Sequence, residues 1–224
     1  EPGRNTGACI GGFVEWVGDD ELIGRGDFRG GWGHDFPYSV FFSARFDRPV
    51  PRQLVRDASG PQPGRCACGP HCRAIAGFGA VPEVNVQVGI SFVSIAKARA
   101  SLEREAAGRG FDDLRATAAV TWERTLSRIE VAGVDETSRT LFYTLFMRLL
   151  SMPTDLGTDD EFGLWHGGVR QFTDFYCLWD SVRNANSLIG LFAPELEAAY
   201  LNALLDIADH TGWLPDAWIA GHSA

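Results

Sequence analysis

The sequence has few basic residues, and this shortage limits its partners. Its 20 lysines and arginines stand against 29 aspartates and glutamates, which gives a formal net charge of -9. A protein that binds nucleic acid needs a basic patch to displace counterions from phosphates. The composition therefore argues against a nucleic-acid partner, and neutral or cationic partners fit better.

Long apolar runs are also lacking. The longest falls well short of the roughly 20 residues that a membrane-spanning helix needs, so we expect no membrane span. Residues 1–20 have neither the basic start nor the hydrophobic core of a signal peptide. With 45% hydrophobic and 22% charged residues, the chain has an ordinary globular composition for one large or two small domains.

Cysteine is scarce, and its count of five is odd, so it does not decide the redox compartment. Cys66, Cys68 and Cys72 lie with His71 in "RCACGPHC". Structural zinc sites use ligand pairs two to four residues apart and a second pair elsewhere. Here one residue separates Cys66 from Cys68, three separate Cys68 from Cys72, and no second pair follows, so we assign no metal ligands. The surrounding prolines and glycines favour a surface loop with a disulfide from Cys72 to Cys66 or Cys68.

The first ninety or so residues alternate as β-strands do. "YSVFFSARF" and "VNVQVGISF" each place apolar side chains at every second position, which predicts strands with one buried face. Glycine-rich connections supply turns, so an antiparallel sandwich is expected rather than a βαβ fold. Only four or five strands can be counted before residue 94, fewer than the about seven of a closed sandwich.

After Ser94, a predicted N-cap, the sequence becomes helical. "IAKARASLEREAAG" is typical of an exposed connecting helix that stops at Gly108. Further helices are predicted over residues 111–129, over 135–151 behind an acidic cap and before Pro153, and from Pro194 onward. The acidic, glycine-rich and aromatic segment between them is a predicted loop where a binding site is often built.

The second half therefore predicts a series of antiparallel α-hairpins. Such hairpins close as a toroid of about twelve helices, which takes on the order of 200 residues, and fewer residues than that follow Ser94. The sandwich lacks its beginning and the toroid its end. We expect an α+β, multi-domain fragment from the middle of a longer protein: residues 1–93 as part of a β-sandwich, 94–110 as a helical linker and 111–224 as part of an α/α barrel.

The stretch "FYCLWDSVRN" places charged side chains inside an aromatic segment. If it forms one helix, Asp180 and Arg183 share a face, with Tyr176 and Trp179 along the same edge. One interpretation is a partly buried ion pair that fixes how the helix packs. The other is a polyhydroxylated ligand, since a sugar offers an apolar face to tryptophan and hydroxyls to charged groups.

The order of five motifs resembles glycoside hydrolase family 92, the calcium-dependent exo-acting α-mannosidases. Together they cover about residues 84–218, and "GGWGHDFPYSVFFSARFDRP" is similar more loosely. The motifs are "VGISFVSIAKARASLERE", "FDDLRATAAVTWERTLSRIEVAG", "LFYTLFMRLLSMPTD", "FYCLWDSVRNANSLIGLFAPE" and "GWLPDAW". The resemblance implies a β-sandwich, a helical linker and an (α/α)6 toroid.

The resemblance also implies a reaction: removal of terminal α-mannose from glycans with inversion, by a glutamic acid and a carboxylate base, with Ca2+ holding the sugar. The motifs that carry the acid, the base and the calcium ligands have no counterpart here, so the catalytic residues stay unassigned and are expected outside this chain. A secreted or periplasmic location and the remainder of the parent polypeptide as a partner follow from the same resemblance.

The "LWDSVR" motif is similar to the family's Trp-Asp helix start that lines the mannose pocket. We therefore predict that Trp179 shapes the pocket wall, Asp180 accepts hydrogen bonds from sugar hydroxyls, and Arg183 holds Asp180 or reaches a hydroxyl. Cys177 and Ser181 depart mildly from the family pattern. Trp165 and His166, in "GLWHGG", are candidates for the pocket rim, where His166 is a departure.

Other polar residues are given ordinary roles. We interpret His34 and Asp35 as turn residues that cap a strand. The acidic run at residues 159–161 lacks the alternating ligands of a calcium loop and is predicted to be a solvated turn. Two alternatives to the hydrolase stay open: a non-catalytic carbohydrate-binding or scaffold protein, and an interaction protein of helical hairpins in which the Asp180 and Arg183 pair is a packing lock.

Overall fold

The computed structural model describes residues 7–30, 37–57, 60–157, 164–165, 168–219 and 221–223. Its contacts divide the chain into two compact units, Glu1–Phe111 and Asp112–Ala224, and each is described by itself. Within the described ranges, no helix has the length and apolarity to cross a membrane. His34, Asp35, His166 and the acidic run 159–161 lie outside the described residues. The domain boundaries predicted at residues 93 and 110 stay predictions.

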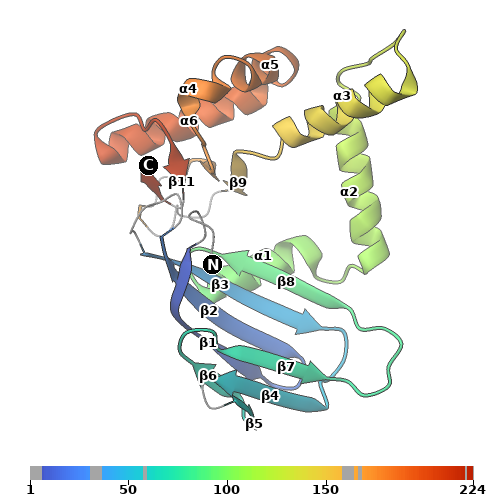
Figure 1. Ribbon diagram of the computed structural model, residues 1–224, viewed down its shortest axis with the longest axis vertical. Coiled ribbons are helices and arrows are strands. Elements are labelled where there is room, and N and C mark those ends of the chain that lie inside the picture. The colour runs from blue at the N-terminus through green and yellow to red at the C-terminus, as the bar shows by residue number, and fades with distance from the viewer. Residues whose placement is uncertain are drawn as a thin grey trace. The chain divides into compact units, whose positions relative to one another are not determined.

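Two antiparallel sheets form most of the first unit (Figure 1). The larger has the strand order β6-β1-β2-β3-β8 and the smaller the order β5-β4-β7. Their bounds are β1 (Ala8–Val17), β2 (Glu21–Arg29), β3 (Pro37–Phe46), β4 (Arg52–Asp57), β5 (Gly60–Pro63), β6 (Cys66–Cys68), β7 (Arg73–Gly77) and β8 (Val86–Ser91).

The core of this unit lies between the two sheets. Trp16, on β1, is buried and its indole N–H donates to the carbonyl of Leu54 on β4, 3.2 Å away. Val14, Val55 and Ala67 are buried around it, and phenylalanines of β3 pack against the same cluster. An apolar core that joins two sheets is the signature of a sandwich, so the predicted antiparallel sandwich fold is confirmed.

The structure corrects the strand count and one buried face. The described part of this unit contains eight strands where four or five were counted. Strands β5 and β6 are among those missed, because they are too short for alternation to be recognised. On β8, Val86, Val88 and Ile90 are exposed, whereas Gly89 and Ser91 are buried. The small residues of β8 face helix α1, so the covered face is the opposite of the predicted one.

Helix α1 (Ile95–Ala106) begins where predicted, because the Ser94 side chain accepts a hydrogen bond from the backbone N–H of Lys97. It is not an exposed connector: Ala98 and Leu102 are buried against the larger sheet. Gly89 permits this close approach, since a Cβ there would lie 2.2 Å from the Ala98 carbonyl oxygen.

The second unit is mainly helical, with three short pairs of extended segments. Among the described residues, helix α2 has no buried side chain, and Phe146 is the one buried side chain of α3. The elements are α2 (Phe111–Leu126), α3 (Glu136–Leu149), β9 (Thr154–Gly157), β10 (Gln171–Thr173), α4 (Leu178–Ser181), α5 (Ala185–Phe192), α6 (Pro194–Thr211), β11 (Trp218–Ile219) and β12 (His222–Ser223).

The core of the second unit is built on α5 and α6, which pack as a hairpin. Tyr200, Leu204 and Ile207 form the buried stripe that the sequence predicts for α6, and Pro194 begins that helix as expected. Phe172, Phe175 and Trp218 close the cluster from the extended segments. One of the predicted antiparallel helical hairpins is therefore present in α5 and α6, and the predicted α+β fold class is confirmed.

Candidate functional site

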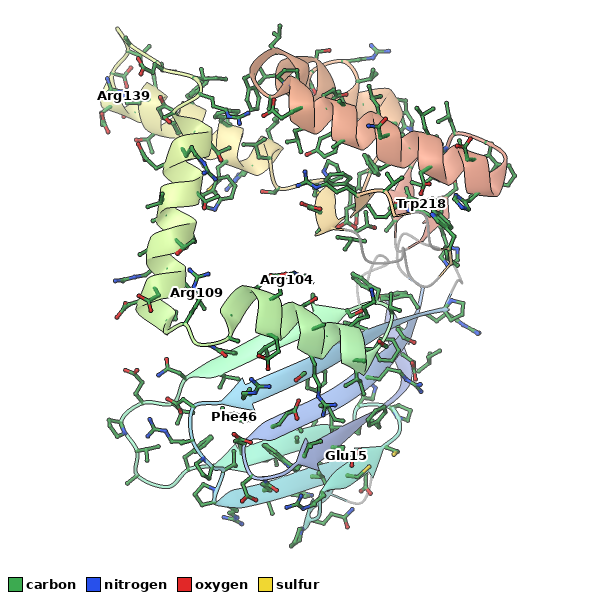
Figure 2. All side chains as sticks on the ribbon, turned by 180° about the vertical axis from the view of Figure 1, so that it is seen from behind. Glu15, Phe46, Arg104, Arg109, Arg139 and Trp218 are labelled. Carbon is green, nitrogen blue, oxygen red and sulfur yellow. The ribbon has the colours of Figure 1, made fainter. Side chains whose placement is uncertain are left out.

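Two sequence motifs that lie forty residues apart meet beside α6. The backbone of Phe175 pairs with that of Trp218 through two N–H to O contacts of 3.0 Å. Leu178 N–H donates to the carbonyl of Asp216 at 2.9 Å. "FYCLWDSVRN" and "GWLPDAW" therefore form one structure, and Trp218 is labelled next to α6 in Figure 2.

This pairing corrects the predicted single helix over residues 175–184. The chain is extended at Phe175, takes a left-handed conformation at Cys177 (φ 46°) and forms only the four-residue helix α4. Asn184 then starts α5 by accepting from the N–H of Ala185 at 2.6 Å. The N–H and carbonyl of Phe175 and the N–H of Leu178 bond to the 216–218 segment, so the helix begins only at Leu178.

Trp179, Asp180 and Arg183 come from α4 and the turn after it, and all three are exposed. The Trp179 side chain is 62% exposed. No hydrogen bond or ion pair joins the side chains of Asp180 and Arg183, both of which are described. The interpretation of a buried packing lock is therefore wrong. An aromatic face, an anion and a cation stand open to solvent within five residues.

Trp165 is held from three sides. Its indole N–H donates to Oδ2 of Asp206 at 2.8 Å, and its ring stacks on His210 with 4.7 Å between centroids and 9° between planes. The ring of Trp218 lies 6.0 Å away, tilted by 48°. Among described residues, no hydrogen bond or ring contact joins Trp165 to Trp179. The other predicted rim residue, His166, lies outside the described ranges.

Asp206 was not predicted as a site residue, yet it organises this region. Its Oδ2 also accepts from the Gln171 carboxamide at 2.6 Å, and Nδ1 of His210 lies 2.8 Å from its backbone carbonyl oxygen. The Asp206 side chain is only 12% exposed. The sequence could have indicated Asp206 only by its spacing, because it lies four residues before His210 on one helix. Its contacts with Trp165 and Gln171 depend on the tertiary fold.

Two buried polar atoms beside this cluster have no hydrogen-bond partner among the described residues. They are Oε1 of Gln171, an acceptor, and Nε1 of Trp218, a donor, and both residues are 2% exposed. Buried polar groups normally find partners. One hydrogen-bond acceptor and one donor of the cluster around Asp206 therefore lack a partner among the described residues.

The β9-β10 hairpin anchors the segment that carries Trp165. Arg170 binds both carboxylate oxygens of Asp155 and lies over the ring of Phe172, 5.2 Å from its centroid. Burial raises the pKa of Asp155, but hydrogen bonds from Arg170 and the Gly157 N–H more than offset this, so its pKa lies below the ordinary value. Thr154 donates to Asp174 at 2.8 Å. The hairpin ends are thus fixed by charged contacts.

The cysteines differ from the sequence prediction. All five cysteines are unpaired, so neither predicted disulfide to Cys72 is present. The sulfur atoms of Cys66 and Cys68 lie 3.9 Å apart. Across the described ranges, no group of three or more His, Cys, Asp or Glu side chains is arranged to hold a metal ion.

Solved structures with the same architecture are sugar-cleaving enzymes. A family GH92 α-mannosidase from Bacteroides thetaiotaomicron matches with a TM-score of 0.82 and 24% identity, over 97% of this chain and 31% of the mannosidase. A family GH92 inverting mannosidase from that organism matches with a TM-score of 0.80 and 20% identity, over 96% of this chain and 30% of its own. At these identities the likeness shows the fold alone.

Sequence comparison identifies the family. The model of the glycosyl hydrolase family 92 catalytic domain matches residues 97–224, and the chain belongs to this family. An uncharacterized secreted glycosidase from Arthroderma benhamiae is 26% identical over 137 residues, which is 59% of this chain and 14% of that protein. The chain thus spans about a third of the solved relatives' length and less of the curated one.

Proposed function

We propose that this chain supplies one wall of the sugar site of an α-mannosidase that removes terminal mannose from glycans with inversion. The observation that carries the proposal is the exposed group Trp179, Asp180 and Arg183, whose charged side chains do not pair with each other. A structure of a family 92 mannosidase in complex with mannoimidazole, and one titled an inverting mannosidase, support the ligand class and the stereochemistry.

The three side chains suit a hexose. A tryptophan face packs against the apolar C–H side of a sugar ring. An ionised carboxylate accepts hydrogen bonds from sugar hydroxyls, and a guanidinium donates hydrogen bonds to hydroxyl oxygens. The two side chains can therefore bind both the hydrogen and the oxygen of hydroxyl groups. Because Asp180 is not engaged by Arg183, both of its oxygens are available to the sugar. Trp165 and His166 are proposed to lie at the rim.

Cleavage of the glycosidic bond needs a general acid and a base, and we assign neither to a residue of this chain. In an inverting glycosidase one carboxylic acid protonates the leaving oxygen, and a carboxylate activates water on the opposite face. The Ca2+ expected from the family does not fit the described residues, since they hold no cluster of three ligating side chains. We therefore route no step through calcium and propose that this chain binds and orients mannose.

The proposal includes the remainder of the parent polypeptide as a partner and mannose-containing glycans as substrate, with a secreted or periplasmic location. One face of β8 carries three exposed apolar side chains, Val86, Val88 and Ile90, which are 46%, 58% and 57% exposed. A contiguous apolar surface of this kind is typical of a position that another part of a protein covers. The curated relative, described as a secreted glycosidase, supports the location.

The proposed function can be tested in the natural gene product that contains this chain. Two variants, Asp180→Asn and Asp180→Ala, are compared with the unaltered protein. We expect turnover of an aryl α-mannoside to fall at least about a hundredfold, because a charged hydrogen bond to the substrate is worth about 1.5–3 kcal/mol and orientation adds to it. The melting temperature should change little, since exposed side chains contribute within about 0.5 kcal/mol.

The matched control is Asp209→Asn on α6, another exposed aspartate, which should retain full turnover. Unchanged turnover in both Asp180 variants would remove the proposed sugar contact. Mannoside binding without any turnover in the unaltered gene product would instead support a non-catalytic carbohydrate-binding protein. Loss of folding in the Asp180 variants would favour the structural role.

A further inference from the structure

The segment "CAC" forms strand β6 at the edge of the larger sheet, and its alternation places two thiols together. Ala67 points inward and is buried, whereas Cys66 and Cys68 are exposed on the other face. Their sulfur atoms lie 3.9 Å apart. β6 pairs with β1, where Glu15 is opposite Cys66 and Phe13 opposite Cys68. Glu15 is labelled in Figure 2.

The structure assigns Cys66 and Cys68 to a solvent-facing dithiol site that a small disulfide compound oxidises to an intramolecular disulfide. A disulfide needs the two sulfur atoms at about 2.05 Å and the two Cβ atoms within about 3.5–4.5 Å, so the sulfurs must approach from the 3.9 Å of the free dithiol. Closing the bond therefore requires side-chain rotation together with a local bend of β6, which is three residues long and lies at the edge of the sheet.

The reaction proceeds by two exchanges with a disulfide RSSR. One thiolate attacks a sulfur of RSSR, forming a mixed disulfide and releasing RS⁻. The second thiolate attacks the protein sulfur of that mixed disulfide, forming the Cys66–Cys68 bond and releasing another RS⁻. The two protons lost by the cysteines end on the two RSH molecules, so the two thiols are oxidised and RSSR is reduced.

The surroundings of Cys66 disfavour its thiolate. Burial raises the pKa of Cys66, and its contact with the Cys68 sulfur and the charge of Glu15 raise it further. Because the thiolate is the attacking species, we expect the exchange to become faster as pH rises. The dithiol does not depend on the proposed function.

Cys72 is a poorer partner than the sequence suggested. It is half-buried and packs against the apolar core of the sandwich. Burial raises its pKa, and the nearby Cys68 and Cys9 raise it further. A sulfur held by the core and slow to ionise is reached less readily than one on the same exposed strand face.

Incubation of the folded chain with excess oxidised glutathione, followed by alkylation of free thiols and intact mass measurement, tests the assignment. We expect a product lighter by two hydrogens, with the other three cysteines open to alkylation after denaturation. Trypsin cuts after Arg65 and Arg73, so Cys66, Cys68 and Cys72 share one peptide and variants must locate the bond. Cys72→Ser should leave the formation rate unchanged.

Cys66→Ser is the decisive variant. It should abolish the intramolecular bond and leave a lasting glutathione adduct on Cys68, because the thiol that would resolve the mixed disulfide is gone. Cys9→Ser, a serine replacement away from β6, is the matched control and should oxidise normally. A bond that disappears in Cys72→Ser, or mixed adducts on Cys66 and Cys68 without closure in the unaltered chain, would overturn the assignment. Circular dichroism before oxidation verifies that each variant is folded.

Discussion

At the scale of single residues, Asp206 fixes more of the candidate site than any residue predicted for it. One of its oxygens accepts from Trp165 and Gln171, and its neighbour one turn later, His210, stacks on the same indole. Gln171 already has one unpartnered buried oxygen. Its carboxamide therefore depends on Asp206 for the hydrogen bond that it does make.

Asp206→Ala should release Trp165. The two N–H groups lose their acceptor, and each unsatisfied buried donor costs about 1–3 kcal/mol, so we expect a lower free energy of unfolding and a shift in tryptophan fluorescence. Trp165→Phe in the Asp206→Ala background should cost less than it does alone. A double-mutant cycle measured by denaturant unfolding gives this coupling.

Asp206→Asn provides the conservative comparison, because its carbonyl oxygen still accepts both N–H groups, and it should recover most of the loss. Additive effects of Trp165→Phe and Asp206→Ala would contradict the anchoring role of Asp206. Asp209→Ala on the same helix is exposed and should leave the fluorescence unchanged.

At the scale of elements, the packing of α1 depends on a glycine in the strand beneath it. A Cβ on Gly89 would lie 2.2 Å from the Ala98 carbonyl oxygen and 2.8 Å from Cβ of Leu102. Neither atom is the end of a flexible side chain, so α1 must move to admit a methyl group. Gly190, inside α5, differs because its nearest neighbour is the Glu197 Cγ atom at 3.9 Å.

Gly89→Ala should therefore lower the free energy of unfolding by about 1–3 kcal/mol through overpacking. Gly190→Ala should instead raise it by up to about 1 kcal/mol, because alanine is the better helix former and space is available. Chemical denaturation of both variants measures the two signs. A neutral Gly89→Ala would show that α1 does not lie as close to β8 as described.

At the scale of the whole molecule, one partly buried charge pair links stability to pH. Glu21 binds Arg99 through two contacts of 2.7 and 3.1 Å and accepts from Ser43 at 2.8 Å. Burial raises the pKa of Glu21, but the hydrogen bonds from Arg99 and Ser43 outweigh this, so its pKa lies below 4.5. These contacts join α1 to two strands of the larger sheet.

A carboxyl group whose pKa is lowered by folding stabilises the folded state at pH values above 4.5, its pKa in the unfolded chain. This contribution is lost as pH falls through the pKa of the folded state. We expect Glu21→Gln to destabilise the first unit near neutral pH and to flatten its loss of stability below about pH 4.5. Thermal unfolding across the acid range measures the slope. The control Glu103→Gln removes a surface pair with Arg45 and should leave the slope of stability against pH unchanged. The same slope in the unaltered protein and in both variants would contradict the role of Glu21.

The sequence by itself determined the local features, because these depend on neighbours a few residues apart. Alternation identified β3, the Ser94 and Asp135 side chains cap α1 and α3 as predicted, and Pro194 begins α6. The order of motifs identified the family. Short strands such as β6 were missed, because three residues carry no measurable period.

Only the tertiary structure decided which side chains meet and which stand free. The backbone pairing of Phe175 with Trp218 reduced a predicted helix to four residues, and α1 reversed the covered face of β8. Asp206 gathers residues from 35 and 41 positions away, and the spacing that suggested an Asp180 and Arg183 ion pair yields two separate exposed charges. Contacts of this kind depend on how distant segments pack, and local spacing does not contain that information.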